Sequence, residues 1–226
     1  MAKGRFITFE GGEGAGKSTQ IRLLAARLRE VAREVVLTRE PGGTPLAERL
    51  RSIILSGGAR KFGPLGEALL FSAARIDHID RKIRPALSRG AFVLCDRFAD
   101  STRAYQGARG GVDPVLLLTM EKVALGGVAP DLTFILDVPP DLGMDRARKR
   151  RGEEAADRFE AEDLAFHRGL REKFLEIAAA EPRRCRVVDA TQPPETVADA
   201  IWACVCERFF FEAKGVVEVL GDKKWA

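Results

Sequence analysis

Short apolar segments alternate with longer amphipathic segments along most of the chain. The short segments are rich in Val, Ile, Leu and Phe and are typical of strands in a sheet that is covered on both faces. The longer segments carry apolar residues at helical spacing and are typical of helices that cover such a sheet. The alternation therefore predicts an α/β fold with a parallel sheet between two helical layers. The predicted strands are Phe6–Glu10, Val35–Arg39, Phe92–Asp96, Leu132–Asp137 and Arg186–Asp189.

The predicted helices fill the intervals between these strands, and several begin with proline, which the first helical turn tolerates. They are Lys17–Val31, Pro45–Leu55, Leu65–Ser88, Pro114–Leu125, Pro139–Arg150, Arg158–Ala179 and Pro193–Phe211. In folds of this class, ligands bind beyond the carboxyl ends of the strands, where the chain enters its strand-to-helix loops. The functional residues are therefore expected at those loops.

The length of 226 residues suits one α/β domain with a large core. We predict a single domain over residues 1–211, followed by an extension at 212–226 that contains the strand-like run Val216–Leu220. Gly152–Asp157 is polar and lacks apolar anchors, so we expect a mobile flap, or lid, at about 146–158. No apolar run is long enough to cross a bilayer and no signal-peptide pattern is visible, which predicts a cytoplasmic protein with no membrane partner.

Cysteine and histidine are too few and too scattered to indicate a disulfide framework or a metal site. The chain has 4 cysteines and 2 histidines, with no Cys-x-x-Cys pair. We therefore expect unpaired, buried thiols. The cysteines are Cys95, Cys185, Cys204 and Cys206, and the histidines are His78 and His167.

The chain is mildly basic, with a formal net charge of +4 at pH 7. Its densest basic cluster, Arg146–Arg151, has no aromatic residues among its cations and is followed by Glu153 and Glu154. Nucleic-acid sites usually combine basic residues with aromatic rings that stack on bases. We therefore expect no nucleic-acid partner, and a small anionic ligand suits the cluster better.

The strongest functional signal is the sequence Gly-Gly-Glu-Gly-Ala-Gly-Lys-Ser at residues 11–18, directly after a predicted strand. It matches the phosphate-loop pattern G-x-x-x-x-G-K-[ST], in which backbone N–H groups and a helix N-terminus surround phosphate oxygens. Lys17 would reach the outer phosphates, and Ser18 would offer its hydroxyl to Mg²⁺. The residues predicted to hold a polyphosphate are Gly11, Gly12, Glu13, Gly14, Ala15, Gly16, Lys17, Ser18 and Thr19.

Two predicted strands end in aspartate, at Asp96 and Asp137. A carboxylate at such a strand end holds Mg²⁺ in phosphate-loop enzymes, directly or through water. Asp96 is the better candidate because Arg97 follows it and places a phosphate-binding guanidinium beside the metal ligand. Either carboxylate could instead cap a neighbouring helix, and this alternative applies more strongly to Asp137.

Further motifs resemble the bacterial thymidylate kinases, a family of nucleoside monophosphate kinases. Thr-Arg-Glu-Pro-Gly-Gly at 38–43 and Ala-Tyr-Gln-Gly at 104–107 are more specific for this family than the phosphate loop. The resemblance runs from Phe6 to about Trp202. It implies a three-layer P-loop kinase fold with a five-stranded parallel sheet and a short lid. It also implies a homodimer that uses ATP and Mg²⁺ to phosphorylate dTMP to dTDP, in dTTP biosynthesis.

The acceptor nucleotide is expected beside Phe71 and Arg75, which lie four residues apart on one face of a predicted helix. A ring can stack on a base there while a guanidinium donates to a base carbonyl, although a core Phe beside a surface Arg is the alternative. The resemblance implies that both side chains hold thymine, with Thr102 and Gln106 at its edge. It also implies that Tyr105 lies against the sugar, where its ring excludes a ribose hydroxyl by volume.

Phosphoryl transfer requires several cations at one place. ATP and a monophosphate bring roughly six negative charges together, of which one Mg²⁺ offsets only two. Lys17 serves the donor, while Arg97 and Arg39 suit the acceptor phosphate. Arg51, on the predicted helix Pro45–Leu55, can approach the same pocket.

Three polar residues have roles that come from the resemblance. It implies that Glu13 binds the 3′-hydroxyl of the acceptor sugar, which is consistent with the cost of a carboxylate among phosphates unless it accepts a hydrogen bond. Glu40 would organise polar groups nearby. Gln192 lies in the turn after the last strand, where the family reads adenine, although the sequence alone indicates only the start of a helix.

The transition-state cation is expected from the lid. Some thymidylate kinases carry an arginine directly after the loop carboxylate, but this chain has Gly14 there. Arg150 and Arg151 are the candidates, although a solvated helix face is the alternative for each. A positioned arginine contributes about 10³–10⁵ in rate, against about 10²–10⁴ for a general base, which favours electrostatic stabilisation over base catalysis.

Other functions fit less well. A kinase for UMP, CMP or GMP would share the phosphate loop, but Phe71, Arg75, Tyr105 and Gln106 favour dTMP. A GTPase switch would need an Asn-Lys-x-Asp motif, and the chain contains no asparagine. A nucleic-acid-binding ATPase would show salt-dependent DNA binding.

Overall fold

The computed structural model of this protein describes residues 4–31, 34–109, 111–152 and 158–209. The extension predicted at 212–226, with its strand-like run Val216–Leu220, lies outside the described residues. The same is true of residues 153–157 of the predicted lid.

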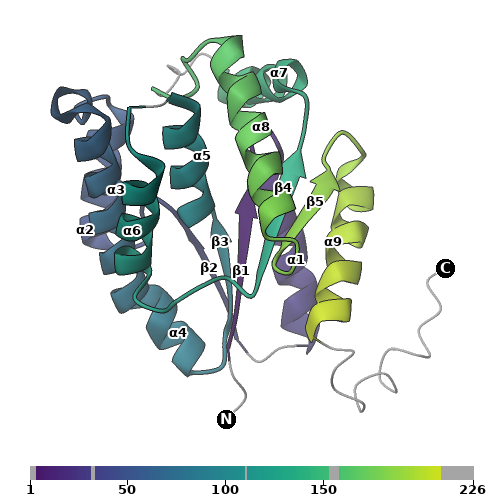
Figure 1. The fold of residues 1–226 in the computed structure, drawn as a ribbon. Coiled ribbons are helices and arrows are strands. Elements are labelled where there is room, and N and C mark those ends of the chain that lie inside the picture. The colour runs from purple at the N-terminus through teal and green to yellow at the C-terminus, as the bar shows by residue number, and fades with distance from the viewer. Residues whose placement is uncertain (1–3, 32–33, 110, 153–157, 210–226) are drawn as a thin grey trace.

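Five parallel strands form a sheet in the order β2-β3-β1-β4-β5 (Figure 1). In the central strand, Ile7 lies in register with Leu94 on one side and with Leu132 on the other. The carboxyl ends of the strands therefore lie at one edge of the sheet, and the predicted α/β fold is confirmed. The strands are β1 Arg5–Glu10, β2 Val35–Arg39, β3 Phe92–Asp96, β4 Leu132–Asp137 and β5 Cys185–Asp189.

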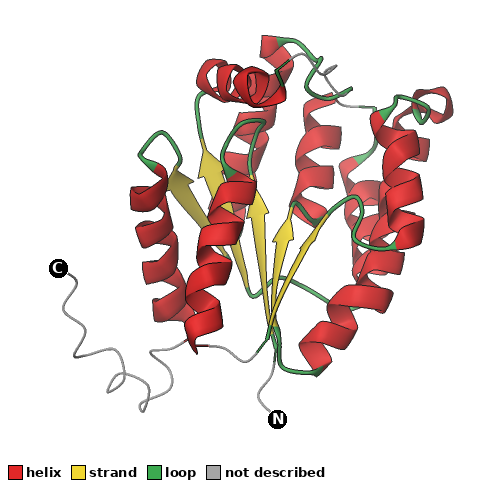
Figure 2. Ribbon diagram, turned by 180° about the vertical axis from the view of Figure 1, so that it is seen from behind, coloured by secondary structure: helices red, strands yellow, loops and turns green. Residues whose placement is uncertain are grey.

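Helices cover both faces of the sheet (Figures 1 and 2). Apolar side chains of β1 pack with those of α1 (Lys17–Val31) and α9 (Pro194–Phe209) in one buried cluster. On the opposite face, α5 (Ala99–Arg109) and α8 (Leu164–Ala180) pack against each other in a second cluster. Because side chains alternate along a strand, Glu10 shares a face with Phe6 and Thr8, away from the cluster that holds Ile7 and Phe9.

The remaining helices lie on the same two layers or at the carboxyl edge of the sheet. They are α2 (Pro45–Leu55), η1 (Arg60–Phe62), α3 (Gly63–His78), η2 (Ile79–Ile83), α4 (Arg84–Ser88), α6 (Pro114–Leu125) and α7 (Pro140–Arg151).

The single long helix predicted over Leu65–Ser88 is divided in the structure. A π-helical segment, η2, separates α3 from the short α4. Pro85 lies in the first turn of α4. Proline has no N–H to donate and its ring would clash with a carbonyl four residues earlier, so a wider turn before it relieves both problems.

Two other helices, α5 and α8, also differ from the predictions. The helix α5 was not predicted, because this segment is polar and lacks an apolar repeat at helical spacing. The helix predicted from Arg158 begins at Leu164, where the Asp163 carboxylate accepts the N–H of Phe166 at 2.8 Å and caps α8.

All four cysteines are free thiols, as predicted. Cys95 and Cys185 are buried, whereas Cys204 and Cys206 on α9 are only half-buried, contrary to the expectation. Over the described ranges, no helix combines the length and apolar character that a membrane span requires.

Candidate active site

A cavity of about 360 Å³ opens at the carboxyl ends of β1 and β3. The phosphate loop before α1 forms one side, and side chains from α2, α3 and α5 form the other. The structure therefore brings together most of the residues that the sequence singles out. The predicted residues that line the cavity are Glu13, Gly14, Ala15, Gly16, Lys17, Ser18, Thr19, Arg39, Glu40, Arg51, Phe71, Arg75, Asp96, Arg97, Thr102, Tyr105 and Arg150.

The phosphate loop contains left-handed turns that favour glycine. Gly14 and Gly16 have φ angles of 66° and 88°. A side chain at Gly14 would also collide with the backbone oxygen of Gly143 on α7. An arginine directly after Glu13 is therefore incompatible with the close approach of α7 to the loop.

Lys17 folds back over its own loop. Its Nζ donates to the carbonyl oxygens of Gly11 and Gly12 at 3.1 and 2.8 Å. Burial lowers the pKa of Lys17 to about 8, and the nearby Arg97 acts in the same direction. Phosphate oxygens that entered the loop would offer Lys17 charged acceptors in place of two neutral carbonyls.

Ser18 and Asp96 meet beside the loop, where the Ser18 hydroxyl donates to Oδ2 of Asp96 at 2.7 Å. Mg²⁺ prefers such oxygen ligands, and a phosphate-bound Mg²⁺ needs only one or two from the protein. Among the residues that the structure describes, no group of three or more His, Cys, Asp or Glu could hold a metal without phosphates. Asp137 is instead bound by Arg171 through two contacts of 2.6 and 2.8 Å. Ser18 and Asp96 therefore fit a magnesium site better than Asp137.

Glu13 is held by a cation and a phenol. Its Oε1 accepts hydrogen bonds from Nη2 of Arg97 at 2.5 Å and from the hydroxyl of Tyr105 at 2.8 Å. Burial alone would raise the pKa of Glu13, but Arg97 and Lys17 outweigh it and lower the pKa to about 2. Glu13 is therefore ionised near neutral pH and can accept a further hydrogen bond from a hydroxyl.

Arg97 has an unusual backbone conformation. Among the described residues other than glycine, it alone has a positive φ, at 66°. Its guanidinium lies 5.2 Å from the ring centre of Tyr105 and donates to the carbonyl of Gly11 at 3.1 Å. Left-handed non-glycine residues cluster at functional sites, because their strain persists only where the surroundings hold them.

Arg75 is buried and bonded to three groups. Its Nε donates to Oε2 of Glu40 at 2.7 Å. Its Nη2 donates to the Thr102 hydroxyl at 3.0 Å and to the Phe98 carbonyl at 3.2 Å. Oε1 of Glu40 lies 3.0 Å from Nδ1 of His78. The alternative in which Arg75 is a surface residue beside a core phenylalanine is therefore wrong. Glu40 instead bonds both Arg75 and His78 and so organises the polar groups there.

Aromatic rings gather on the side of the cavity that α3 and α5 form. The ring of Phe159, another residue of the lining, lies 6.3 Å from that of Phe71. It meets the ring of Tyr105 edge to face at 5.0 Å. Sequence reasoning missed Phe159, whose only signal is a lone aromatic residue in a charged segment beside the lid. The three rings can enclose a flat ligand.

The remaining predicted cations are held by partners of their own. Nη2 of Arg39 lies 3.1 Å from Glu48 on α2, and Nη1 of Arg51 donates to the carbonyl of Pro41 at 2.9 Å. Both arginines line the cavity.

The two lid arginines share one carboxylate. Glu160, which the sequence did not single out, lies 3.2 Å from Arg150 and 2.7 Å from Arg151. Arg150 and Glu160 line the cavity, whereas Arg151 does not.

Four predicted binding residues do not line the main cavity. Gly11 and Gly12 border a separate cavity of about 20 Å³ beneath the loop. Gln106 is buried, and its carboxamide has no hydrogen-bond partner within the described ranges. Gln192 is exposed and donates to Asp189 at 3.0 Å. The proposed contacts of Gln106 with thymine and of Gln192 with adenine stay predictions.

Comparisons with known proteins point to one family. A family model described as Thymidylate kinase matches residues 9–201. A thymidylate kinase from Bradyrhizobium sp. (strain ORS 278) is 57% identical, over 92% of both chains. One from Bradyrhizobium diazoefficiens is 54% identical, over 96% of this chain and 95% of the relative. The crystal structure of thymidylate kinase from Ehrlichia chaffeensis superposes with a TM-score of 0.71 at 36% identity, covering 90% of this chain and 98% of that one.

Proposed function

The chain belongs to the thymidylate kinase family, and on that premise we propose that it transfers the γ-phosphoryl group of MgATP to dTMP, giving dTDP and ADP in dTTP biosynthesis. The observation that carries this proposal is that the phosphate loop and the Phe71–Arg75 pocket line one cavity. One side of the cavity suits a polyphosphate, and the other suits a planar base.

The distribution of cations supports an in-line transfer between the two sides. Lys17 belongs to the loop that would hold ATP, while Arg39 and Arg51 line the same cavity and would serve the acceptor phosphate. Arg97 contacts both sides, because it donates to the Gly11 carbonyl of the loop and its guanidinium lies 5.2 Å from the ring centre of Tyr105 on α5. Charged and polar groups that are already in place usually contribute more to the rate of such a reaction than any other single effect.

The acceptor pocket supports a thymine nucleotide. Phe71 would stack on the base, and Arg75 would present a guanidinium that Glu40 and Thr102 hold in one orientation. The ionised Glu13 would accept the 3′-hydroxyl of the sugar. A rigid site of this kind loses little conformational entropy on binding.

The lid would complete the site. Arg150 and Arg151 are bound to Glu160, and the phosphates of ATP would compete with that carboxylate for their guanidinium groups. Closure over the nucleotides would also exclude water as a competing acceptor.

Mg²⁺ fits the oxygen atoms of Ser18 and Asp96. Held there with ATP, the ion would supply positive charge that offsets the negative charge developing during phosphoryl transfer. The protein's contribution is to place one hydroxyl and one carboxylate 2.7 Å apart beside the loop.

An ADP-release assay with a panel of acceptors tests the proposal. We expect the highest kcat/KM with dTMP, lower values with dUMP, and little activity with UMP, CMP or GMP. Preference for any acceptor over dTMP would favour the alternative, a kinase for another nucleoside monophosphate. A homodimer and a cytoplasmic location are part of the same proposal.

A further inference from the structure

We propose that Glu10 is a positioning residue for phosphoryl transfer, because it holds the left-handed turn from which Arg97 reaches the acceptor phosphate. The inference rests on the proposed function and on the expectation, from the sequence, that Arg97 binds the acceptor phosphate. Glu10 is the last residue of β1, directly before the phosphate loop, and none of its surface is exposed.

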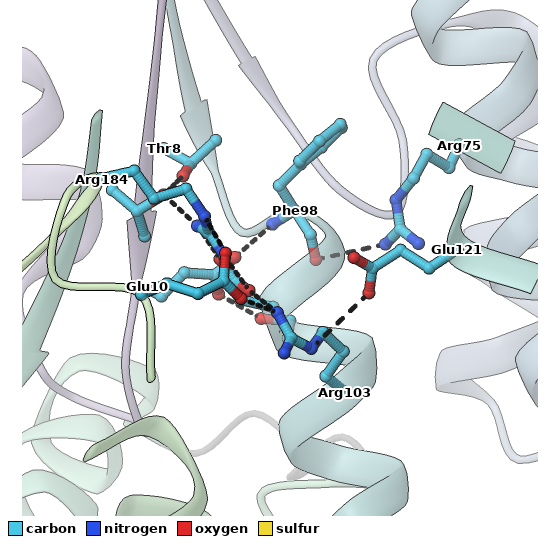
Figure 3. A network of polar contacts seen from close by, with 11 residues as sticks. Thr8, Glu10, Arg75, Phe98, Arg103, Glu121 and Arg184 are labelled. Carbon is cyan, nitrogen blue, oxygen red and sulfur yellow. Dashed lines mark hydrogen bonds and ion pairs between the residues drawn. The ribbon is translucent and has the colours of Figure 1, made fainter. Parts of the chain in front are cut away.

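The carboxylate of Glu10 holds the turn at two points. Its Oε1 accepts the backbone N–H of Phe98 (Figure 3), over a distance of 2.7 Å, and its Oε2 accepts the Ser101 hydroxyl at 2.5 Å. The same Ser101 oxygen accepts a hydrogen bond from Nη1 of Arg97 at 3.3 Å. Glu10 therefore fixes both the peptide that follows Arg97 and a side chain that contacts its guanidinium.

The other backbone groups of the turn have partners as well. The N–H of Arg97 donates to the carbonyl of Phe9 at 2.9 Å. The carbonyl of Phe98 accepts from Nη2 of Arg75 at 3.2 Å (Figure 3). Phe98 is thus bonded to Glu10 through its N–H and to Arg75 through its carbonyl. This residue connects the arginine proposed for the base with the arginine proposed for the phosphate.

Burying a charged side chain at position 10 lowers the stability of the fold. Burial raises the pKa of Glu10 to about 7, and Asp100 on α5 adds repulsion, although Ser101, Arg97 and Phe98 act in the opposite direction. A neutral side chain would avoid this cost. A buried carboxylate that binds the Phe98 N–H and Ser101 is therefore better explained by its effect on the turn at Arg97 than by stability.

Thr8 provides a matched control. It precedes Glu10 by two residues on the same strand and face, and its hydroxyl lies 2.7 Å from that of Thr133. Thr8→Val removes one buried hydroxyl near Glu10 without touching the turn at Arg97.

The test compares the full-length wild type, Glu10→Gln, Thr8→Val, Arg97→Lys and the double variant Glu10→Gln/Arg97→Lys at pH 8. Glutamine keeps an acceptor for the Phe98 N–H but removes the charge, and its NH₂ cannot accept from Ser101. We expect Glu10→Gln to lower kcat/KM for dTMP about tenfold, equal to ~1.4 kcal/mol. The KM for ATP should stay within about twofold, and the melting temperature should not fall. Thr8→Val should keep kcat/KM within about twofold.

The double variant separates positioning from a general defect. If Glu10 acts through Arg97, Glu10→Gln should lower kcat/KM for dTMP by less than about twofold when Arg97 is already replaced by lysine. Wild-type kcat/KM in Glu10→Gln, or the same tenfold loss in both backgrounds, would overturn the proposal.

A crystal structure of Glu10→Gln gives a readout that does not depend on dTMP. We expect the Arg97 guanidinium to leave Glu13, and an Arg97–Glu13 contact unchanged at 2.5 Å would contradict the positioning role. Wild-type protein that released no ADP with dTMP would instead contradict the proposed function, and the crystal structure would still decide the role of Glu10.

Discussion

The Oε1 atom of Glu13 binds both the guanidinium of Arg97 and the phenol of Tyr105. Arg75 is held in the same way by Glu40 and Thr102. Each of these side chains therefore has a fixed orientation within the protein itself. Groups held in position need not reorganise when charge develops in the transition state, which is where preorganised sites gain most of their rate.

Tyr105 should exclude a ribose hydroxyl through its ring and not through its phenol. Tyr105→Phe keeps the ring and loses the 2.8 Å hydrogen bond to Glu13. We expect this variant to retain the preference for dTMP over its ribonucleotide counterpart, while Tyr105→Ala loses it, about tenfold or more. The measurement is the ratio of kcat/KM for the two acceptors. Equal ratios in the Phe and Ala variants would contradict a steric role.

The lid arginines should act on kcat and not on acceptor binding. Arg150 lines the cavity, so Arg150→Ala is expected to lower kcat by about 10³ while the Kd for dTMP changes less than about threefold. Arg151→Ala should have the smaller effect, because Arg151 lies outside the lining. Unchanged kcat in both variants would refute the assignment of the transition-state cation to the lid.

The site residues that can be predicted from sequence are those in motifs of fixed spacing after a strand. Lys17 and Ser18 of the phosphate loop, and Asp96 and Arg97 after β3, are of this kind. Phe159 and Glu160 could not be predicted in the same way, because their place in the cavity depends on how the segment before α8 packs on distant elements. Glu10 lies beside a recognised motif, but its partners Phe98 and Ser101 are about ninety residues away along the chain.

At the scale of secondary-structure elements, the fold follows from alternating apolar segments, and the five strands were located to within one residue. The helices with an apolar face were also located. The predictions failed where other forces decide the outcome. The polar α5 is helical because it packs against α8. Tertiary contacts can impose helical structure on a sequence whose local preference for it is weak. The division between α3 and α4 reflects Pro85 within an otherwise continuous apolar pattern.

The contact between α7 and the phosphate loop should depend on the absence of a side chain at Gly143. A Cβ there would collide with the backbone oxygen of Glu13, whereas a Cβ at Gly169 on α8 would meet nothing within 4 Å. We expect Gly143→Ala to cost about 1–3 kcal/mol in unfolding free energy, and Gly169→Ala to add about 0.5–1 kcal/mol. The KM for ATP should rise in Gly143→Ala alone.

Denaturant unfolding gives the stability of the two variants, and steady-state kinetics gives their KM for ATP. The two variants can be compared directly because each replaces a helical glycine by alanine. Equal stability changes in the two variants would show that α7 does not closely contact the phosphate loop at Gly143.

At the scale of the whole molecule, the exposed apolar side chains are concentrated on α3 and α6, which pack side by side. A soluble protein rarely leaves such a surface open unless a partner covers it. We assign this surface to a second copy of the chain, in keeping with the proposed homodimer. The residues are Leu65, Leu69 and Ile76 on α3, and Val115, Leu116, Leu118 and Val123 on α6.

Replacement of Leu69, which is 53% exposed, should separate the proposed dimer. We expect light scattering at micromolar concentration to give twice the chain mass for the wild type and a single chain mass for Leu69→Glu. Val31→Glu, at an exposed position on α1, should remain dimeric. A monomeric wild type would contradict the dimer, and a dimeric Leu69→Glu would exclude this surface.

The buried Glu10 should make stability fall as pH rises. Its pKa is raised from 4.5 to about 7. The folded protein therefore binds more protons than the unfolded chain between these values, so the contribution of Glu10 decreases through that window and levels off about one pH unit above it. The size of the decrease is on the order of 3 kcal/mol.

Unfolding of wild type and Glu10→Gln at pH 5 and pH 8 measures this effect. The glutamine variant should gain stability relative to the wild type at the higher pH. A difference between the two proteins that does not change with pH would show that the carboxyl does not titrate in this window.

We propose that one cavity presents two nucleotides to each other, the donor in the phosphate loop and the acceptor between Phe71 and Arg75. The most direct measurement is a crystal structure with dTMP and a non-hydrolysable MgATP analogue. We expect thymine stacked on Phe71, the acceptor phosphate at Arg97, and the analogue's phosphates within residues 11–18. Thymine bound away from these side chains, or an empty phosphate loop at saturating analogue, would contradict it.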